Sequence, residues 1–208
     1  MRMCEKLPVR CLLAAVMLLA AGALQLRAEK IRAMMEGTVY LSGGDTMEMR
    51  DSSRIAIPMK KKPLMIMEHA YTARQKVADR VEPTRVDSVV LWNSLAPQRR
   101  HTLCYLPDYG WCWILERGPR IRVYAFAPKG YYIGGNGGMW YMGKGCILVE
   151  KDGTITRFDK TNKASDRKFR ERIAAMVADD PALVERLLSS NRRRDKALRM
   201  MSLYDPER

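Results

Sequence analysis

The sequence predicts an α+β fold in which an antiparallel sheet comes first in the chain and a helical segment follows it. Three observations support this fold class. Residues 36 to 159 alternate between short runs of β-forming residues and turn residues. Near Lys160 the apolar residues change to a helical period. Strands that precede helices, instead of alternating with them, are typical of helices gathered on one side or end of an antiparallel sheet.

We expect roughly 8 to 10 short strands, in an antiparallel sheet or a partly closed barrel. The first part of the chain supplies four runs rich in β-forming residues, and breakers such as Gly43-Gly44-Asp45, Pro63 and Pro83 separate them. These runs are Thr38 to Leu41, Arg54 to Ile57, Leu64 to Tyr71 and Val86 to Trp92.

The clearest strand runs from Arg120 to Ala127. One of its faces carries arginine and aromatic side chains: Arg120, Arg122, Tyr124 and Phe126. The other face is purely apolar: Ile121, Val123, Ala125 and Ala127. Because successive side chains of a strand point to opposite faces, the apolar side should face the core.

Two hairpins are indicated by their turn residues. Lys151-Asp152-Gly153 separates two strand-like runs and carries the Asp-Gly signal of a tight hairpin turn. A four-residue loop, Pro107 to Gly110, would place glycine last, where a left-handed conformation is common. That register pairs Cys104 with Trp113 and argues against a Cys104–Cys112 disulfide, whereas a three-residue loop would place the two cysteines opposite each other.

Two or three helices are expected after residue 160, packed on the sheet. Phe169, Ile173, Met176 and Val177 recur at helical spacing behind the possible caps Ser165 and Asp166. Asp180-Pro181 offers a cap followed by proline at the first helical position. A third short helix is expected after Asn191, with Leu198 and Met201 on its apolar side.

The N-terminus has the three parts of a secretory signal. Arg2, Lys6 and Arg10 precede an uncharged apolar run, Cys11 to Leu24, which is shorter than the ~20 residues of a membrane-spanning helix. The run ends with the small residues Ala21-Gly22-Ala23, so cleavage is expected after Ala23, with Ala28 as the alternative site. The sequence therefore predicts a signal peptide at 1–28 and export to the periplasm, the envelope or the outside of the cell.

The predicted domain plan is a signal peptide at 1–28, a β-rich domain at 29–160 and a helical segment at 161–208. The leader holds four basic residues and one acidic residue, so the mature chain keeps a net charge of +11. This excess favours anionic partners, and we expect a polysaccharide, an anionic envelope surface or another envelope protein. Nucleic acid is not expected, since the basic residues are dispersed along the chain.

The chain resembles uncharacterised exported bacterial proteins that have a β-rich body and a C-terminal helical tail. The resemblance rests on the leader, on Val86-Asp87-Ser88-Val89-Val90 and on the Asp-Asp-Pro segment at Asp179 to Pro181. It implies an exported protein with this architecture, and it implies no activity.

The residues that could carry chemistry do not form a motif. A zinc site could draw on His101, Cys104, Cys112 and Cys146, but there is no Cys-x-x-Cys, so we expect neither a metal nor a cofactor. A nucleophile–base pair of Cys112 with a histidine is the basis of one alternative, a Cys/His-dependent hydrolase. Gly134 to Gly138 lacks the lysine of a phosphate-binding loop and is expected to form a hairpin loop, or alternatively a flap over a binding face.

Aromatic residues cluster between Tyr105 and Tyr141, which hold ten of the sixteen in the chain. Such a cluster can form a core, or it can form an exposed face that binds sugar rings or a protein. We expect a non-catalytic exported binding protein, with a scaffold that docks on a partner protein as the other alternative. The candidate binding face comprises Trp113, Arg120, Arg122, Tyr124, Phe126, Tyr131, Tyr132 and Trp140.

Overall fold

The computed structural model describes residues 34–49, 51–159, 166–189 and 193–206, all within one of the two compact units of the chain, Ala33–Arg208. The predicted signal peptide and the predicted helix-start residues Ser165 and Asn191 lie outside the described residues. No described helix has the length and apolar character needed to cross a membrane.

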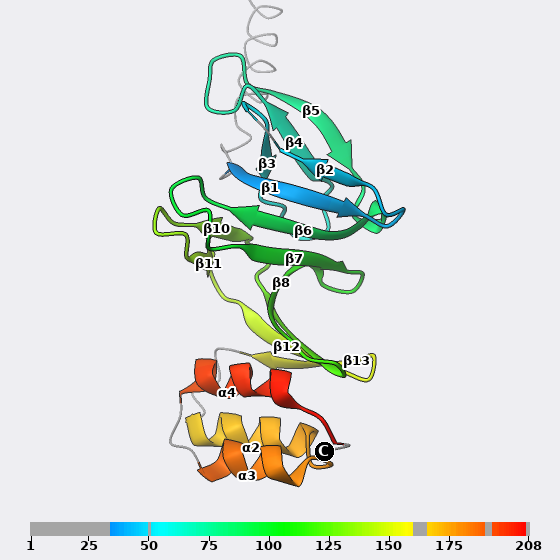
Figure 1. The fold of residues 1–208 in the computed structure, drawn as a ribbon, viewed down its shortest axis with the longest axis vertical. Coiled ribbons are helices and arrows are strands. Elements are labelled where there is room, and N and C mark those ends of the chain that lie inside the picture. Colours follow the sequence, from blue (N-terminus) through cyan, green and yellow to red (C-terminus); the bar gives the residue numbers. More distant parts are fainter. Residues whose placement is uncertain (1–33, 50, 160–165, 190–192, 207–208) are drawn as a thin grey trace, which may run out of the picture. The chain divides into compact units, whose positions relative to one another are not determined.

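The strands come first and the helices last, as the sequence predicts (Figure 1). The strands are β1 (Met34–Leu41), β2 (Thr46–Glu48), β3 (Arg54–Ala56), β4 (Leu64–Glu68), β5 (Lys76–Val81), β6 (Val86–Trp92), β7 (His101–Leu106), β8 (Gly110–Arg117), β9 (Ile121–Phe126), β10 (Tyr131–Ile133), β11 (Met139–Tyr141), β12 (Cys146–Lys151) and β13 (Thr154–Asp159). The helices are α2 (Asp166–Met176), α3 (Pro181–Ser189) and α4 (Arg194–Met200), with short 3₁₀ turns η1 (Pro83–Arg85) and η2 (Met201–Leu203).

An 11-stranded antiparallel sheet forms the body of the fold. Its strand order is β13-β12-β9-β8-β7-β6-β1-β3-β4-β5, with β2 paired to β1, and β10 and β11 form a separate hairpin. The order runs from β13 at one edge to β5 at the other, so the sheet is open and the predicted α+β class is confirmed. The sequence pattern gave no signal for β2, β5 and β10, because they are short or, in β5, mostly charged and exposed.

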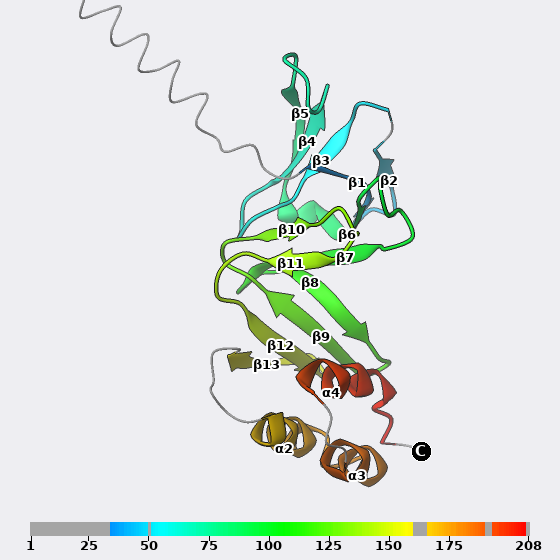
Figure 2. The same ribbon diagram turned by 90° about the vertical axis from the view of Figure 1, so that its left-hand side faces the viewer.

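The β10–β11 hairpin covers a first core, which lies on the part of the sheet built by β1 and β3 to β8 (Figure 2). Tyr131 fixes the hairpin to this core. Its hydroxyl donates to the carbonyl of Ala125 at 2.7 Å and accepts from the amide of Ala127 at 3.1 Å. Burial raises the pKa of the Tyr131 hydroxyl, so the group stays a neutral hydrogen-bonding group.

The helices cover the apolar side of β9, as its alternation predicts. Ile121, Val123 and Ala125 are buried in a second core with side chains of β12, β13 and all three helices. Ile173, Leu187 and Tyr204 are fully buried there. The helical segment is therefore packed on the sheet through a continuous apolar contact.

Two local predictions are confirmed in detail. Asp180 accepts the amide hydrogen of Leu183 at 2.9 Å and so caps α3, which begins at Pro181. Asp152 and Gly153 both have positive φ, 48° and 79°, between the paired residues Lys151 and Thr154. Two positive φ values are typical of the primed turns whose twist matches that of a hairpin.

The predicted register of the β7–β8 hairpin is wrong. Leu106 pairs with Gly110 and Cys104 pairs with Cys112, so the loop has three residues and not four. Packing decides this register, because the observed pairing places Leu103 beside Trp113 and Tyr105 beside Trp111 at the first core. Gly110 is still required, because its φ is +101° and an added Cβ would lie 2.2 Å from the carbonyl oxygen of Lys60.

Candidate functional site

The structure does not bring the eight residues of the predicted binding face together. Tyr124 and Tyr131 are buried, with 1% and 3% of their surface exposed. Trp113 and Phe126 are half-buried, whereas the remaining four are exposed: Arg120, Arg122, Tyr132 and Trp140. The two buried side chains cannot contact a ligand without a rearrangement of the fold.

Tyr124 belongs to a small core on the side of β9 that faces away from the helices. It packs with Cys112, Cys146 and Leu148, and its hydroxyl donates a hydrogen bond to Glu150. Burial raises the pKa of the Tyr124 hydroxyl, with Glu150 as the next cause. Aromatic character therefore serves packing at this position, and the predicted platform of arginines and aromatic rings on β9 is interrupted.

The other members near β9 are also engaged within the fold. Trp113 packs against both large cores and meets the ring of His101 edge to face, with ring centroids 5.3 Å apart. Arg120 pairs with Asp152 at 2.9 Å. Phe126 contacts the ring of Tyr109, which lies in the β7–β8 turn, with centroids 5.7 Å apart.

Tyr132 and Trp140 are different, because they are exposed and directly opposite each other on β10 and β11. Their exposed fractions are 44% and 53%. Ile133 and Met139, the neighbouring pair, point to the first core. The alternation of the hairpin thus places two aromatic rings side by side on its outward face.

Met142 and Leu95 extend this outward face. The amide of Met142 donates to the carbonyl of Gly130 at 2.9 Å, which continues the hairpin pairing beyond Tyr131–Tyr141 and places Met142 on the same face as Trp140, two residues earlier. Leu95, in the loop between β6 and β7, is 79% exposed and lies 4.0 Å from the Cβ position of Gly135. We call Leu95, Tyr132, Trp140 and Met142 the hairpin patch.

The loop between β6 and β7 is held against the glycine-rich turn of the hairpin. The side-chain amide of Asn93 donates to the carbonyl of Gly134 at 3.3 Å, and His101 Nε2 lies 2.7 Å from the carbonyl oxygen of Gly137. A Cβ at Gly137, whose φ is +75°, would lie 2.6 Å from the Cβ of Ala96. Gly134 to Gly138 thus forms the expected hairpin turn, and glycine is required at 137 for both conformation and close contact.

The residues considered for a metal or a nucleophile do not form a reactive centre. Within the described ranges, no group of three or more histidine, cysteine or acidic side chains could hold a metal ion. Cys112 is fully buried on the side of β8 opposite to Trp113, against which His101 packs. His69 is exposed in the turn that follows β4. Neither histidine is therefore placed as the base of a Cys112 nucleophile.

Sequence reasoning identified Tyr132 and Trp140 but missed Leu95 and Met142. Leu95 is a single leucine inside a polar turn segment, Asn93 to Arg100, which is a weak signal of an exposed contact residue. Comparison with known proteins gave no match: no protein-family model, no curated protein and no solved structure matches the chain significantly.

Proposed function

We propose that the chain is an exported, non-catalytic binding protein and that the hairpin patch is its recognition surface. The export part rests on the N-terminal signal, and the compartment is the periplasm, the envelope or the cell exterior. The binding part rests on one observation, the exposed cross-strand pair Tyr132–Trp140 on a hairpin whose other face is anchored in the core.

The anchoring of the hairpin supports recognition. Tyrosine and tryptophan supply a large contact area and lose little side-chain freedom on binding, which is why they are common at the centres of interfaces. Three sets of contacts fix the backbone of this hairpin: the hydrogen bond of Tyr131, the burial of Ile133 and Met139 in the first core, and the contacts of the β6–β7 loop. A rigid surface of this kind loses little entropy when a partner binds.

The proposal is tested by capture from an envelope extract of the producing organism. We expect that wild-type protein retains a specific component and that Tyr132→Ala and Trp140→Ala lose most of it. Tyr40→Ala is the matched control, because Tyr40 is 40% exposed on β1, away from the hairpin. Equal retention by wild type and both hairpin variants would reject the proposal.

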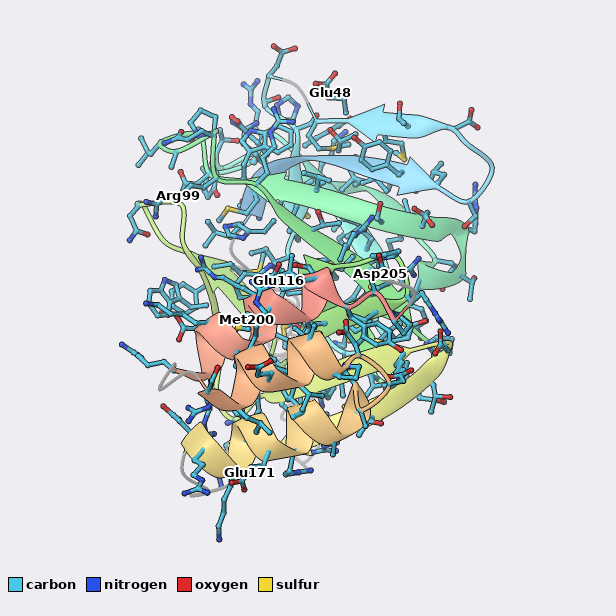
Figure 3. The ribbon with its side chains drawn as sticks, turned by 60° about the horizontal axis from the view of Figure 1, so that its bottom comes forward. Glu48, Arg99, Glu116, Glu171, Met200 and Asp205 are labelled. Carbon is cyan, nitrogen blue, oxygen red and sulfur yellow. The ribbon has the colours of Figure 1, made fainter. Side chains whose placement is uncertain are left out.

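A second candidate is a scaffold that docks on a partner protein through its helices. The observation that favours it is an apolar groove between α2 and α3, with Leu188 47% exposed at its edge. Glu171 and Glu185 also line this groove, and Figure 3 shows Glu171 on α2. Leu188→Glu would abolish partner capture if this surface were the functional one, and it would leave capture through the hairpin patch intact.

A further inference from the structure

The hairpin patch is apolar in all four of its side chains, and two of them are aliphatic. Leu95 and Met142 are 79% and 40% exposed, so open apolar surface extends beyond the aromatic pair. Exposed apolar side chains gathered on one surface mark a contact site for a protein or a membrane. Aliphatic side chains at the ends of such a patch are suited to hydrocarbon, since they offer no ring to stack on a sugar.

The charged side chains are all cationic in the two segments that form this patch and in a third segment, 58–63, that contacts the hairpin at Gly130. Residues 58–63, 93–101 and 128–145 contain no aspartate or glutamate. Their basic residues are all exposed: Lys60, Lys61, Lys62, Arg99, Arg100, Lys129 and Lys144. This local bias is stronger than that of the whole chain, where 23 acidic residues accompany 37 basic ones.

Contacts in the structure place two of these cations, Arg99 and Lys129, at opposite ends of the hairpin. At the turn end, side-chain carbons of Arg99 lie 3.0 and 3.1 Å from the Cβ position of Gly137, and Figure 3 shows Arg99 projecting away from the sheet. At the other end, the Lys129 side chain passes 2.9 Å from the Cβ position of Gly143. A side-chain carbon of Met59, which precedes the three lysines, lies 2.8 Å from the Cβ position of Gly130.

Several polar groups beside the patch are engaged within the fold. Asn93 bonds to the backbone of Gly134 and Leu95, and Asn136 accepts the amide hydrogen of Gly138. Glu36, which bonds to Trp92 beside Arg100, is already paired with Arg54 at 3.2 Å. The patch itself therefore presents two aromatic rings and two aliphatic side chains, and the segments that carry it contain no carboxylate side chain.

We propose, building on the proposed function, that the hairpin patch binds the surface of a bilayer that contains anionic lipids. Trp140 and Tyr132 would lie at the level of the headgroups, where tryptophan and tyrosine are enriched, with Leu95 and Met142 in the acyl boundary. The surrounding lysines and arginines are attracted to the lipid phosphates, and this attraction weakens as salt rises. Binding is peripheral, through side chains on a folded hairpin.

The test measures the fluorescence of Trp140 with vesicles of defined composition. The protein is produced with its own leader, recovered after processing and mixed with phosphatidylglycerol/phosphatidylcholine vesicles or with phosphatidylcholine vesicles. Phosphatidylglycerol that is brominated near the headgroup end of its acyl chains quenches tryptophans at the membrane interface, which is the depth proposed for Trp140. We expect a blue shift and quenching with anionic vesicles, and Trp140→Phe should abolish both signals because the other three tryptophans are in the sheet.

The variants separate lipid binding from other modes of association. Trp140→Ala should lower the vesicle partition coefficient roughly tenfold or more, and Lys129→Gln/Lys144→Gln should lower it and reduce its salt dependence. Tyr40→Ala should bind as wild type. Vesicle association without quenching of Trp140, or equal binding to both vesicle types, would overturn the inference.

The failure of this inference can be distinguished from failure of the proposed function. If capture from envelope extract depends on Tyr132 while vesicles are not bound, the patch recognises a protein or a polysaccharide, and only the lipid assignment falls. Binding of soluble alginate, with a shift in Trp140 emission that vesicles do not give, would likewise overturn the lipid assignment. If the wild-type protein shows neither Tyr132-dependent capture from envelope extract nor binding to vesicles, the proposed function itself is rejected.

Discussion

Substitution of Leu187 by alanine tests whether the helices and the sheet unfold as one unit. Leu187 lies on α3 and is fully buried against the second core, whereas its neighbour Leu188 is 47% exposed. A fully buried leucine replaced by alanine loses about 3 kcal/mol, from transfer and from the cavity that remains. The same change at Leu188 should cost about 1 kcal/mol or less, because half of that side chain is already in water.

Urea unfolding followed by two probes gives the assay. All four tryptophans lie in strands, so tryptophan fluorescence reports on the sheets, and circular dichroism at 222 nm reports on the helices. With a denaturant slope of about 2 kcal/mol/M, Leu187→Ala should move the urea midpoint down by about 1.5 M in both signals. Leu188→Ala should move it by about 0.5 M or less. A midpoint that falls for the helices while the tryptophan signal keeps its wild-type midpoint would refute a single cooperative unit.

Three further predictions follow from the cysteines, the carboxylates and the leader. Burial raises the pKa of the Cys104 thiol to about 12. In native protein at pH 8 this thiol should therefore be alkylated about a thousandfold more slowly than an ordinary cysteine. Rapid labelling of Cys104, detected by peptide mapping, would contradict this prediction. Hydrogen bonds from Lys151 and Tyr204 lower the pKa of Asp179 to about 2, so its stabilising effect is present above about pH 4 and is lost as the pH falls toward 2. Asp179→Asn should therefore weaken the acid dependence of the melting temperature in this range, while Asp195→Asn on α4 serves as the control, and equal acid sensitivity of both variants and wild type would argue against the ion pair. Intact mass of the exported protein should give an N-terminus at Leu24 or Glu29, whereas a chain that retains all 208 residues would reject the cleaved leader.

Features that depend on a few neighbouring residues could be predicted from the sequence. The apolar side of β9, the Asp152-Gly153 turn and the Asp180 cap all follow from spacing or from backbone preferences within about ten residues. Each of them is found where it was expected. The order of strands and helices was likewise sufficient for the fold class, because helices that follow a set of strands cover an antiparallel sheet.

Features that depend on distant packing could not be predicted. The β7–β8 register follows from the burial of Trp111 and from the approach of Gly110 to Lys60, a residue fifty positions earlier in the chain. Tyr124 is buried by its partners across two strands, Leu148 and Ile114, so alternation along β9 alone could not separate it from the exposed Arg122. Aromatic clustering indicated the segment that contains Tyr132 and Trp140, but only the tertiary structure distinguishes rings in a core from rings on a surface.

A photo-crosslinking amino acid at position 132 tests the central claim most directly. Benzoylphenylalanine replaces Tyr132 in one variant and Tyr40, which is similarly exposed on β1, in another. Both variants are irradiated in exporting cells and analysed by mass spectrometry. If the outward face of the β10–β11 hairpin is the recognition surface and the partner is a membrane, position 132 should give adducts with the mass of an anionic lipid and position 40 should not. Equal adducts at both positions, or none at position 132, would contradict the account.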